Sequence, residues 1–85
     1  MVNKILIKVI IPEYELEYEL YIPNNKKIGT IKKCFINSIN NNSQFAFEKT
    51  ENEVRFIDRE TGIEFENNMY VKDSGIKNGS IILAI

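Results

Sequence analysis

The chain has 85 residues, of which 44% are hydrophobic and 27% charged, and its formal net charge is −1. A chain of this length has room for one small core, so we expect residues 1–85 to form a single domain, and the composition excludes disorder throughout. The charge offers no basic stripe for nucleic acid, and no stretch approaches the roughly 20 apolar residues that span a bilayer. Neither nucleic acid binding nor membrane insertion is expected.

The single cysteine, Cys34, excludes an intramolecular disulfide, which fits a reducing compartment. The opening segment MVNKILIKVIIPEYE does not have the form of a signal peptide, because Lys8 interrupts its apolar run and no small-residue cleavage site follows. We therefore expect a cytoplasmic protein. The abundance of Ile, Asn and Lys is typical of an AT-rich bacterial genome.

Two strands are predicted first. β-Branched residues alternate through Lys4–Ile11, and Pro12 ends this run because it has no N–H to donate. The segment Tyr14–Ile22 also alternates, which predicts a half-buried strand and, with the short link at Pro12, a hairpin. Its apolar face carries Leu16, Tyr18, Leu20 and Ile22, and its other face carries Glu15, Glu17, Glu19 and Tyr21.

From Lys27 the apolar period changes from two to 3.6 residues. Ile28, Ile31, Phe35 and Ile39 recur at this spacing and predict an amphipathic helix of roughly three turns. Asn25 and Thr30 are alternative caps for its start, and the Asn-rich segment 40–44 ends it.

Cys34 lies beside the apolar stripe of this helix, so we expect a small buried hydrophobic side chain. The alternative is a reactive thiol, although a nucleophile in the middle of a helix lacks a base. The only basic cluster is expected to be a solvated helix start; it comprises Lys26, Lys27, Lys32 and Lys33.

The second half of the chain predicts three further strands. Glu53–Asp58 alternates, Asp58–Gly62 is a turn, and Ile63 and Phe65 form a short strand. Apolar residues then anchor an irregular segment before a final strand over Ser80–Ile85; they are Met69, Val71 and Ile76. For Phe45 and Phe47 the pattern leaves a short strand and a packed loop as open alternatives.

This order of elements predicts an α+β fold with a mixed five-stranded sheet and one helix packed on one face. The first and last strands are expected side by side at the centre, with a right-handed crossover setting the hand. The arrangement is the β-grasp, or ubiquitin-like, fold.

The last 23 residues carry a more specific resemblance. The segment Ile63–Ile85 resembles the second half of ubiquitin-like domains, and KDSGIKNGSIILAI at its end is similar to the closing turn of the YukD/EsaB-type ubiquitin-like proteins of type VII (WXG) secretion loci. Gly75 and Gly79 suit positive φ angles, Ile76 between them is expected in the core, and Asp73 is expected to accept backbone hydrogen bonds. These residues stabilise the fold and carry no catalytic chemistry.

The chain lacks the residues of common catalytic and metal sites. It has no histidine, one cysteine and no glycine-rich phosphate loop, so we expect no enzyme activity, no catalytic residues, no cofactor and no metal site. Glu15, Glu17 and Glu19 are carboxylates that a hard cation could use, but such a row on a strand is more often a solvated face that discourages edge pairing.

The face of the sheet away from the helix is the expected partner-binding surface. The candidate residues combine an apolar centre with charged neighbours: Leu6, Lys8, Ile10, Arg55, Ile57, Ile81, Leu83 and Ile85. Ubiquitin uses the same side of its sheet for recognition, so the resemblance indicates the same surface. Self-association through this face is a further expectation.

The resemblance implies a non-catalytic interaction module, namely a cytosolic accessory or regulator of a type VII secretion system with a protein partner from that machinery. Proteins of this family end without the C-terminal Gly-Gly tail of conjugated modifiers and sulfur carriers, and the segment SIILAI likewise ends inside the predicted strand. A carrier or modifier in a truncated form, and a ubiquitin-like domain of a larger secretion component, are the alternatives.

Overall fold

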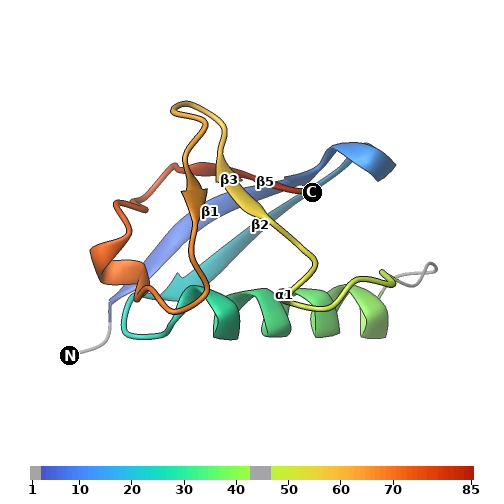
Figure 1. The fold of residues 1–85 in the computed structure, drawn as a ribbon, viewed down its shortest axis with the longest axis horizontal. Helices are drawn as coiled ribbons and strands as arrows, with labels where there is room; N and C mark the ends of the chain where they lie inside the picture. Colours follow the sequence, from blue (N-terminus) through green and yellow to red (C-terminus); the bar gives the residue numbers. More distant parts are fainter. Residues whose placement is uncertain (1–2, 43–46) are drawn as a thin grey trace.

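The computed structural model describes residues 3–42 and 47–85. Along these residues the elements are β1 (Lys4–Ile11), β2 (Leu16–Pro23), α1 (Ile28–Asn42), β3 (Phe56–Asp58), β4 (Glu64–Phe65) and β5 (Ile81–Ala84). The strands form one sheet in the order β2-β1-β5-β3-β4, and α1 lies across one face of it (Figure 1). β1 and β5 are parallel neighbours at the centre, while the other pairs are antiparallel. The predicted α+β arrangement is confirmed.

The β1–β2 hairpin is confirmed, but its second strand begins later than predicted. Pro12–Tyr14 form a 3-10 turn, and Glu15 after it has a left-handed backbone with φ of 54°. Tyr14 and Glu15 therefore belong to the connection, and the strand starts at Leu16. As a result, the acidic row on this strand consists of Glu17 and Glu19 without Glu15.

Helix α1 is longer than predicted, and neither Asn25 nor Thr30 caps it. It spans 15 residues and begins at Ile28, which places Thr30 inside the first turn. Its first amides find backbone partners in a distant loop: the Ile28 N–H donates to the Met69 carbonyl at 2.8 Å, and the Gly29 N–H donates to the Asn67 carbonyl at 3.0 Å. These bonds satisfy backbone N–H groups of the first helical turn, which a capping side chain would otherwise accept.

The core fills the space between α1 and the sheet. Phe35 on the helix stands at its centre, because its ring meets Tyr18 of β2 edge-on at 5.7 Å and Phe56 of β3 edge-on at 6.1 Å. Phe47 is buried in the segment after the helix, outside any strand, which decides between its two predicted alternatives. Phe45 lies outside the described residues.

Strand β3 is shorter than the predicted Glu53–Asp58. Residues 51–53 form a turn in which the Glu53 carboxylate accepts hydrogen bonds from the Thr50 amide and hydroxyl, at 3.1 and 3.0 Å. Val54 is nevertheless fully buried. Its alternation with Phe56 therefore reflects core packing more than strand pairing.

The closing turn follows the predicted design with one exception. Gly75 and Gly79 have φ angles of 87° and 88°, and Ile76 between them is buried. Two backbone amides of this turn donate to serine hydroxyls, Ile76 N–H to Ser74 at 3.2 Å and Lys77 N–H to Ser80 at 3.0 Å, and not to the expected carboxylate of Asp73. Asp73 instead ends a short 3-10 helix, Val71–Asp73, whose first residue is fully buried.

Candidate functional site

The outer face of the sheet, meaning the side opposite α1, carries one apolar row across its centre. Ile10 of β1 pairs with Leu83 of β5, and Leu83 pairs with Ile57 of β3. Paired residues point to the same face of a sheet, so the three side chains lie side by side. Carboxylates stand at both ends of the row, because Glu17 pairs with Ile10 and Glu64 pairs with Ile57.

The remaining candidate residues of β1 and β5 lie beside this row. Lys8 pairs with Ile81 on one side and with Glu19 on the other, and Leu6 pairs with Tyr21. Leu6 and Ile81 therefore extend the apolar surface, and Lys8 introduces a cation next to it. The side chains of the apolar row and of Leu6 and Ile81 are half-buried, since neighbours on the sheet cover part of each.

Arg55 and Ile85 complete the surface beyond the ends of β3 and β5. The Arg55 N–H donates to the Ile85 carbonyl at 2.7 Å, and the Ile85 N–H donates back to the Arg55 carbonyl at 3.0 Å. This reciprocal pair continues the pairing of the two strands by one residue each. Ile85 is 39% exposed, and Arg55 is also exposed. All eight predicted residues thus lie on the outer face.

Two ion pairs border the apolar centre. Arg55 donates through Nε and Nη2 to one Glu64 carboxylate oxygen, at 3.1 and 3.0 Å. The Lys8 ammonium lies 4.0 Å from the Glu17 carboxylate. The four side chains are between 37% and 60% exposed, so solvent screens these pairs and they stabilise the fold little. They give the apolar row a charged rim.

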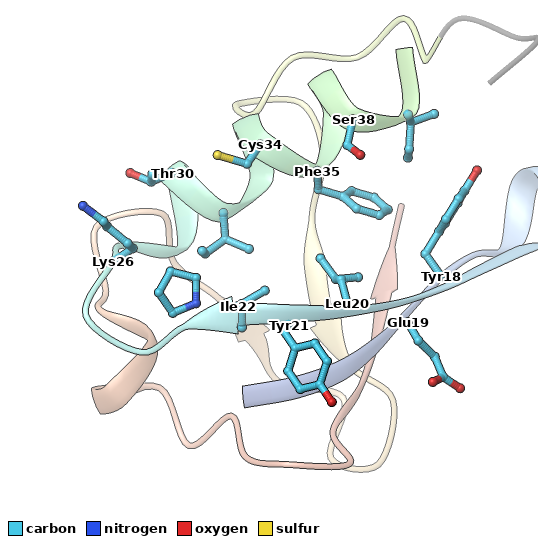
Figure 2. Close-up of a pocket in the computed structure, with 13 residues that line it drawn as sticks. Tyr18, Glu19, Leu20, Tyr21, Ile22, Lys26, Thr30, Cys34, Phe35 and Ser38 are labelled. Atoms are coloured by element: carbon cyan, nitrogen blue, oxygen red, sulfur yellow. The ribbon is translucent and has the colours of Figure 1, made fainter. Parts of the chain in front are cut away.

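A groove at the edge of the sheet was not predicted from the sequence. A groove of about 530 Å³ lies between β2 and α1 (Figure 2). Cys34 borders it and is exposed, so the expectation of a buried thiol is wrong. β2 is an edge strand of the sheet, and within residues 3–42 and 47–85 no further strand lies beyond it to cover this flank of the helix.

The opposite flank of α1 is covered, and it buries a lysine that was expected to be solvated. Lys32 is only 3% exposed. Its ammonium donates to the Val54 carbonyl at 2.8 Å and to the Asn67 side-chain oxygen at 2.6 Å, and it lies 5.5 Å from the centre of the Phe56 ring. Burial lowers the pKa of Lys32 below the 10.5 of an ordinary lysine, although the Glu64 carboxylate acts in the opposite direction.

Within residues 3–42 and 47–85 no group of three or more His, Cys, Asp or Glu side chains is placed to hold a metal ion. In the same ranges, no helix has the length and apolarity needed to cross a bilayer. What the geometry presents is an apolar outer face with a charged rim, and a groove at the edge of the sheet.

Comparison with solved structures identifies the fold. The ubiquitin-like domain of an Arabidopsis thaliana protein superimposes with a TM-score of 0.73 over 99% of this chain and 78% of that one, at 18% identity. The chain has a ubiquitin-like fold. No protein-family model matches its sequence, and no curated protein is significantly similar to it in sequence.

The same ubiquitin-like fold occurs in proteins of different kinds. A chain in the structure of the toluene 4-monooxygenase HD complex with 4-bromobenzoate matches with a TM-score of 0.75, at 12% identity, over 96% of both chains. AtBAG1, solved in complex with HSP70, matches with a TM-score of 0.72 at 15% identity, over 95% of this chain and 39% of that one. At these identities the likeness concerns the fold alone, and the resemblance to secretion proteins stays a prediction.

Proposed function

We propose that this chain is a non-catalytic protein-interaction module that docks through the outer face of its sheet. The observation that carries the proposal is the row of Ile10, Leu83 and Ile57, which lies on the side that α1 does not cover. Contiguous apolar surfaces with polar rims mark protein contacts in soluble proteins. AtBAG1 includes a segment of this fold and was solved with HSP70, so the fold occurs in proteins that bind other proteins.

The charged rim fits a docking role better than a role in stability. The Arg55–Glu64 and Lys8–Glu17 pairs are open to solvent and contribute little to folding. Charges at the edge of an apolar contact instead select partners and orient them during association. A partner that fits this face has an apolar patch bounded by charges of both signs.

We further propose that the partner is a cytosolic component of a type VII secretion machinery, because the segment Asp73–Ile85 resembles the YukD/EsaB-type proteins. The support for this step is sequence resemblance in the closing turn and last strand. It predicts a small helical WXG-type protein or an FtsK/SpoIIIE-like ATPase encoded near this gene.

The test compares two threonine substitutions. Leu83→Thr removes the apolar side chain at the centre of the row and introduces a β-branched residue, which suits a strand. Ile63→Thr is the matched control, because Ile63 is 61% exposed and lies outside the outer-face set. Each protein, tagged, is used to capture partners from cells of its source and is also examined for self-association by sedimentation.

We expect wild-type protein and the Ile63→Thr variant to capture the same partner, or to self-associate equally, and the Leu83→Thr variant to lose at least about 90% of that binding, which corresponds to about 1.4 kcal/mol. Equal binding by all three proteins contradicts docking through the outer face. Capture that depends on Leu83 but recovers no secretion component contradicts only the secretion assignment.

A further inference from the structure

The free edge of β2 and the groove beside it form a surface separate from the outer face. β2 ends the strand order and pairs only with β1 among the described strands. The groove lies on the helix side of this strand, so it and the apolar row occupy opposite faces of the sheet (Figure 2). Glu17 belongs both to the rim of the apolar row and to this edge, but the groove itself does not include the apolar row.

The pairing register shows which backbone groups of β2 face away from the sheet. On β1, the Lys8 N–H donates to Ser80 and the Leu6 carbonyl accepts from Gly79, so the even-numbered residues of β1 bond towards β5. Its odd-numbered residues must then bond to β2, and their partners there are Leu16, Tyr18, Leu20 and Ile22. The N–H and C=O groups of Glu17, Glu19 and Tyr21 consequently point to the free edge.

The groove supplies apolar contacts along that edge. Leu20, Ile22 and Tyr18 of β2 face the helix, which contributes Ile31 and Phe35 to the opposite wall (Figure 2). Glu19 and Tyr21 also line the groove although their side chains point away from it, so it is their backbone that borders the space. A volume of about 530 Å³ is in the range of roughly 300–1,000 Å³ typical of binding pockets.

Charge decides what kind of strand this edge accepts. A strand added to β2 alternates like β2 itself, with every second side chain in the groove and the others beside Glu17, Glu19 and Tyr21 on the outer face. Both glutamates are exposed, and Tyr21 is 67% exposed. Lysine or arginine opposite the glutamates is therefore favoured, and arginine also suits the Tyr21 ring.

The same charges oppose a second copy of this chain. Pairing β2 with the β2 of another copy brings rows of glutamates together across the new strand pair, and like charges in that arrangement are destabilising. We propose that the β2 edge and the adjoining groove bind an extended peptide segment of a partner protein, in which apolar residues alternate with lysine or arginine.

The test uses the full chain and three blocked peptides. Acetyl-KLKVKLK-amide has the proposed pattern, KKLLVKK has the same composition without alternation, and ELEVELE keeps the apolar residues and reverses the charge. Affinity is measured by NMR, from the chemical-shift changes of isotope-labelled protein as each peptide is added. Amide hydrogen exchange and alkylation by iodoacetamide of Cys34, which borders the groove, locate the contact.

We expect KLKVKLK to bind, to slow amide exchange at Glu17, Glu19 and Tyr21 at least about tenfold, and to slow alkylation of Cys34. The Leu83→Thr variant is expected to bind it as wild type does, because Leu83 lies on the other face. Absence of binding at millimolar peptide, or binding that leaves these amides and the thiol unprotected, overturns the proposal. Equal affinity for KKLLVKK also overturns it, since attraction by charge alone then explains the binding.

Charge reversal sharpens the result. In the double variant Glu17→Lys/Glu19→Lys we expect affinity for KLKVKLK to fall at least about tenfold and the preference to change to ELEVELE, because cross-strand attraction becomes repulsion at two positions. Glu60→Lys/Glu66→Lys is the matched control, with the same change in net charge on exposed residues away from β2. Similar losses in both double variants contradict a site at the β2 edge.

Discussion

Two neighbouring residues of β5 test which face of the sheet is the core. Ile82 is fully buried and pairs with Val9 at the centre of the sheet. Leu83, the next residue, is half-buried on the outer face. Substituting each in turn by alanine removes the same number of side-chain carbon atoms from the same strand. The two variants therefore differ mainly in which layer loses its contacts.

The expected costs differ by a factor of about three. Truncating a fully buried isoleucine removes its transfer free energy and leaves a cavity, which costs about 3 kcal/mol for Ile82→Ala within the usual range of about 2–5. Leu83→Ala loses partial burial and leaves no enclosed cavity, so we expect about 1 kcal/mol. A domain of 85 residues has a total stability of about 4–13 kcal/mol, so the first change is a large fraction of it.

Urea unfolding followed by circular dichroism measures both values. With an m-value of about 1 kcal/mol/M, the unfolding midpoint is expected to fall by about 3 M for Ile82→Ala and about 1 M for Leu83→Ala. A Leu83→Ala cost equal to or larger than that of Ile82→Ala would refute the assignment of the outer face. Equal m-values in all proteins are needed for the comparison to be valid.

Three further predictions concern single residues. The folded-state pKa of Lys32 is lowered, so the unfolded chain binds this proton more tightly than the folded protein does. The stability of wild type relative to Lys32→Met is therefore expected to rise with pH between the folded-state pKa and 10.5, and to be constant below the folded-state pKa. Urea unfolding at several pH values measures this difference, and a difference that does not change with pH contradicts the lowered pKa. Gly79→Ala is expected to lower the free energy of unfolding by about 1–2 kcal/mol, because φ is 88° and alanine is strained there. The added Cβ would have no atom within 4 Å, so this backbone strain is the whole expected cost. An unchanged melting temperature contradicts the prediction. Cys34 of the folded protein is expected to react completely with a thiol reagent without denaturant, and protection of the thiol would show that the flank of α1 is covered.

The two flanks of α1 explain the errors in the sequence predictions for its side chains. The helical period separates apolar from polar positions, but it assumes that every charged residue faces water. Lys32 is buried because Val54 and Asn67, which are 22 and 35 residues away in the sequence, supply oxygens for its ammonium. Cys34 is exposed because β2 is the last of the described strands on this side of the sheet. Both outcomes depend on segments that the local pattern does not contain.

The helix start and the length of β3 were missed for a similar reason. The first amides of α1 bond to the carbonyls of Asn67 and Met69, so a distant loop replaces the local cap that the sequence suggested. Val54 alternates with Phe56 and is buried, but its N–H donates to the Thr50 carbonyl in the preceding turn and not to a neighbouring strand. Burial and strand pairing produce the same alternation, and a sequence pattern does not separate them.

The sequence by itself determined the order of the elements, the two faces of the central strands and the closing turn. It did so because alternation assigns Ile82 and Leu83 to opposite faces, and because Gly75 and Gly79 permit positive φ angles at little steric cost. The eight outer-face residues follow from this alternation once the strand order is known. Only the tertiary structure decided where the sheet ends relative to the helix. That boundary depends on distances between segments that are not neighbours in the chain. Among the described strands it leaves the outer edge of β2 unpaired, and it opens the groove.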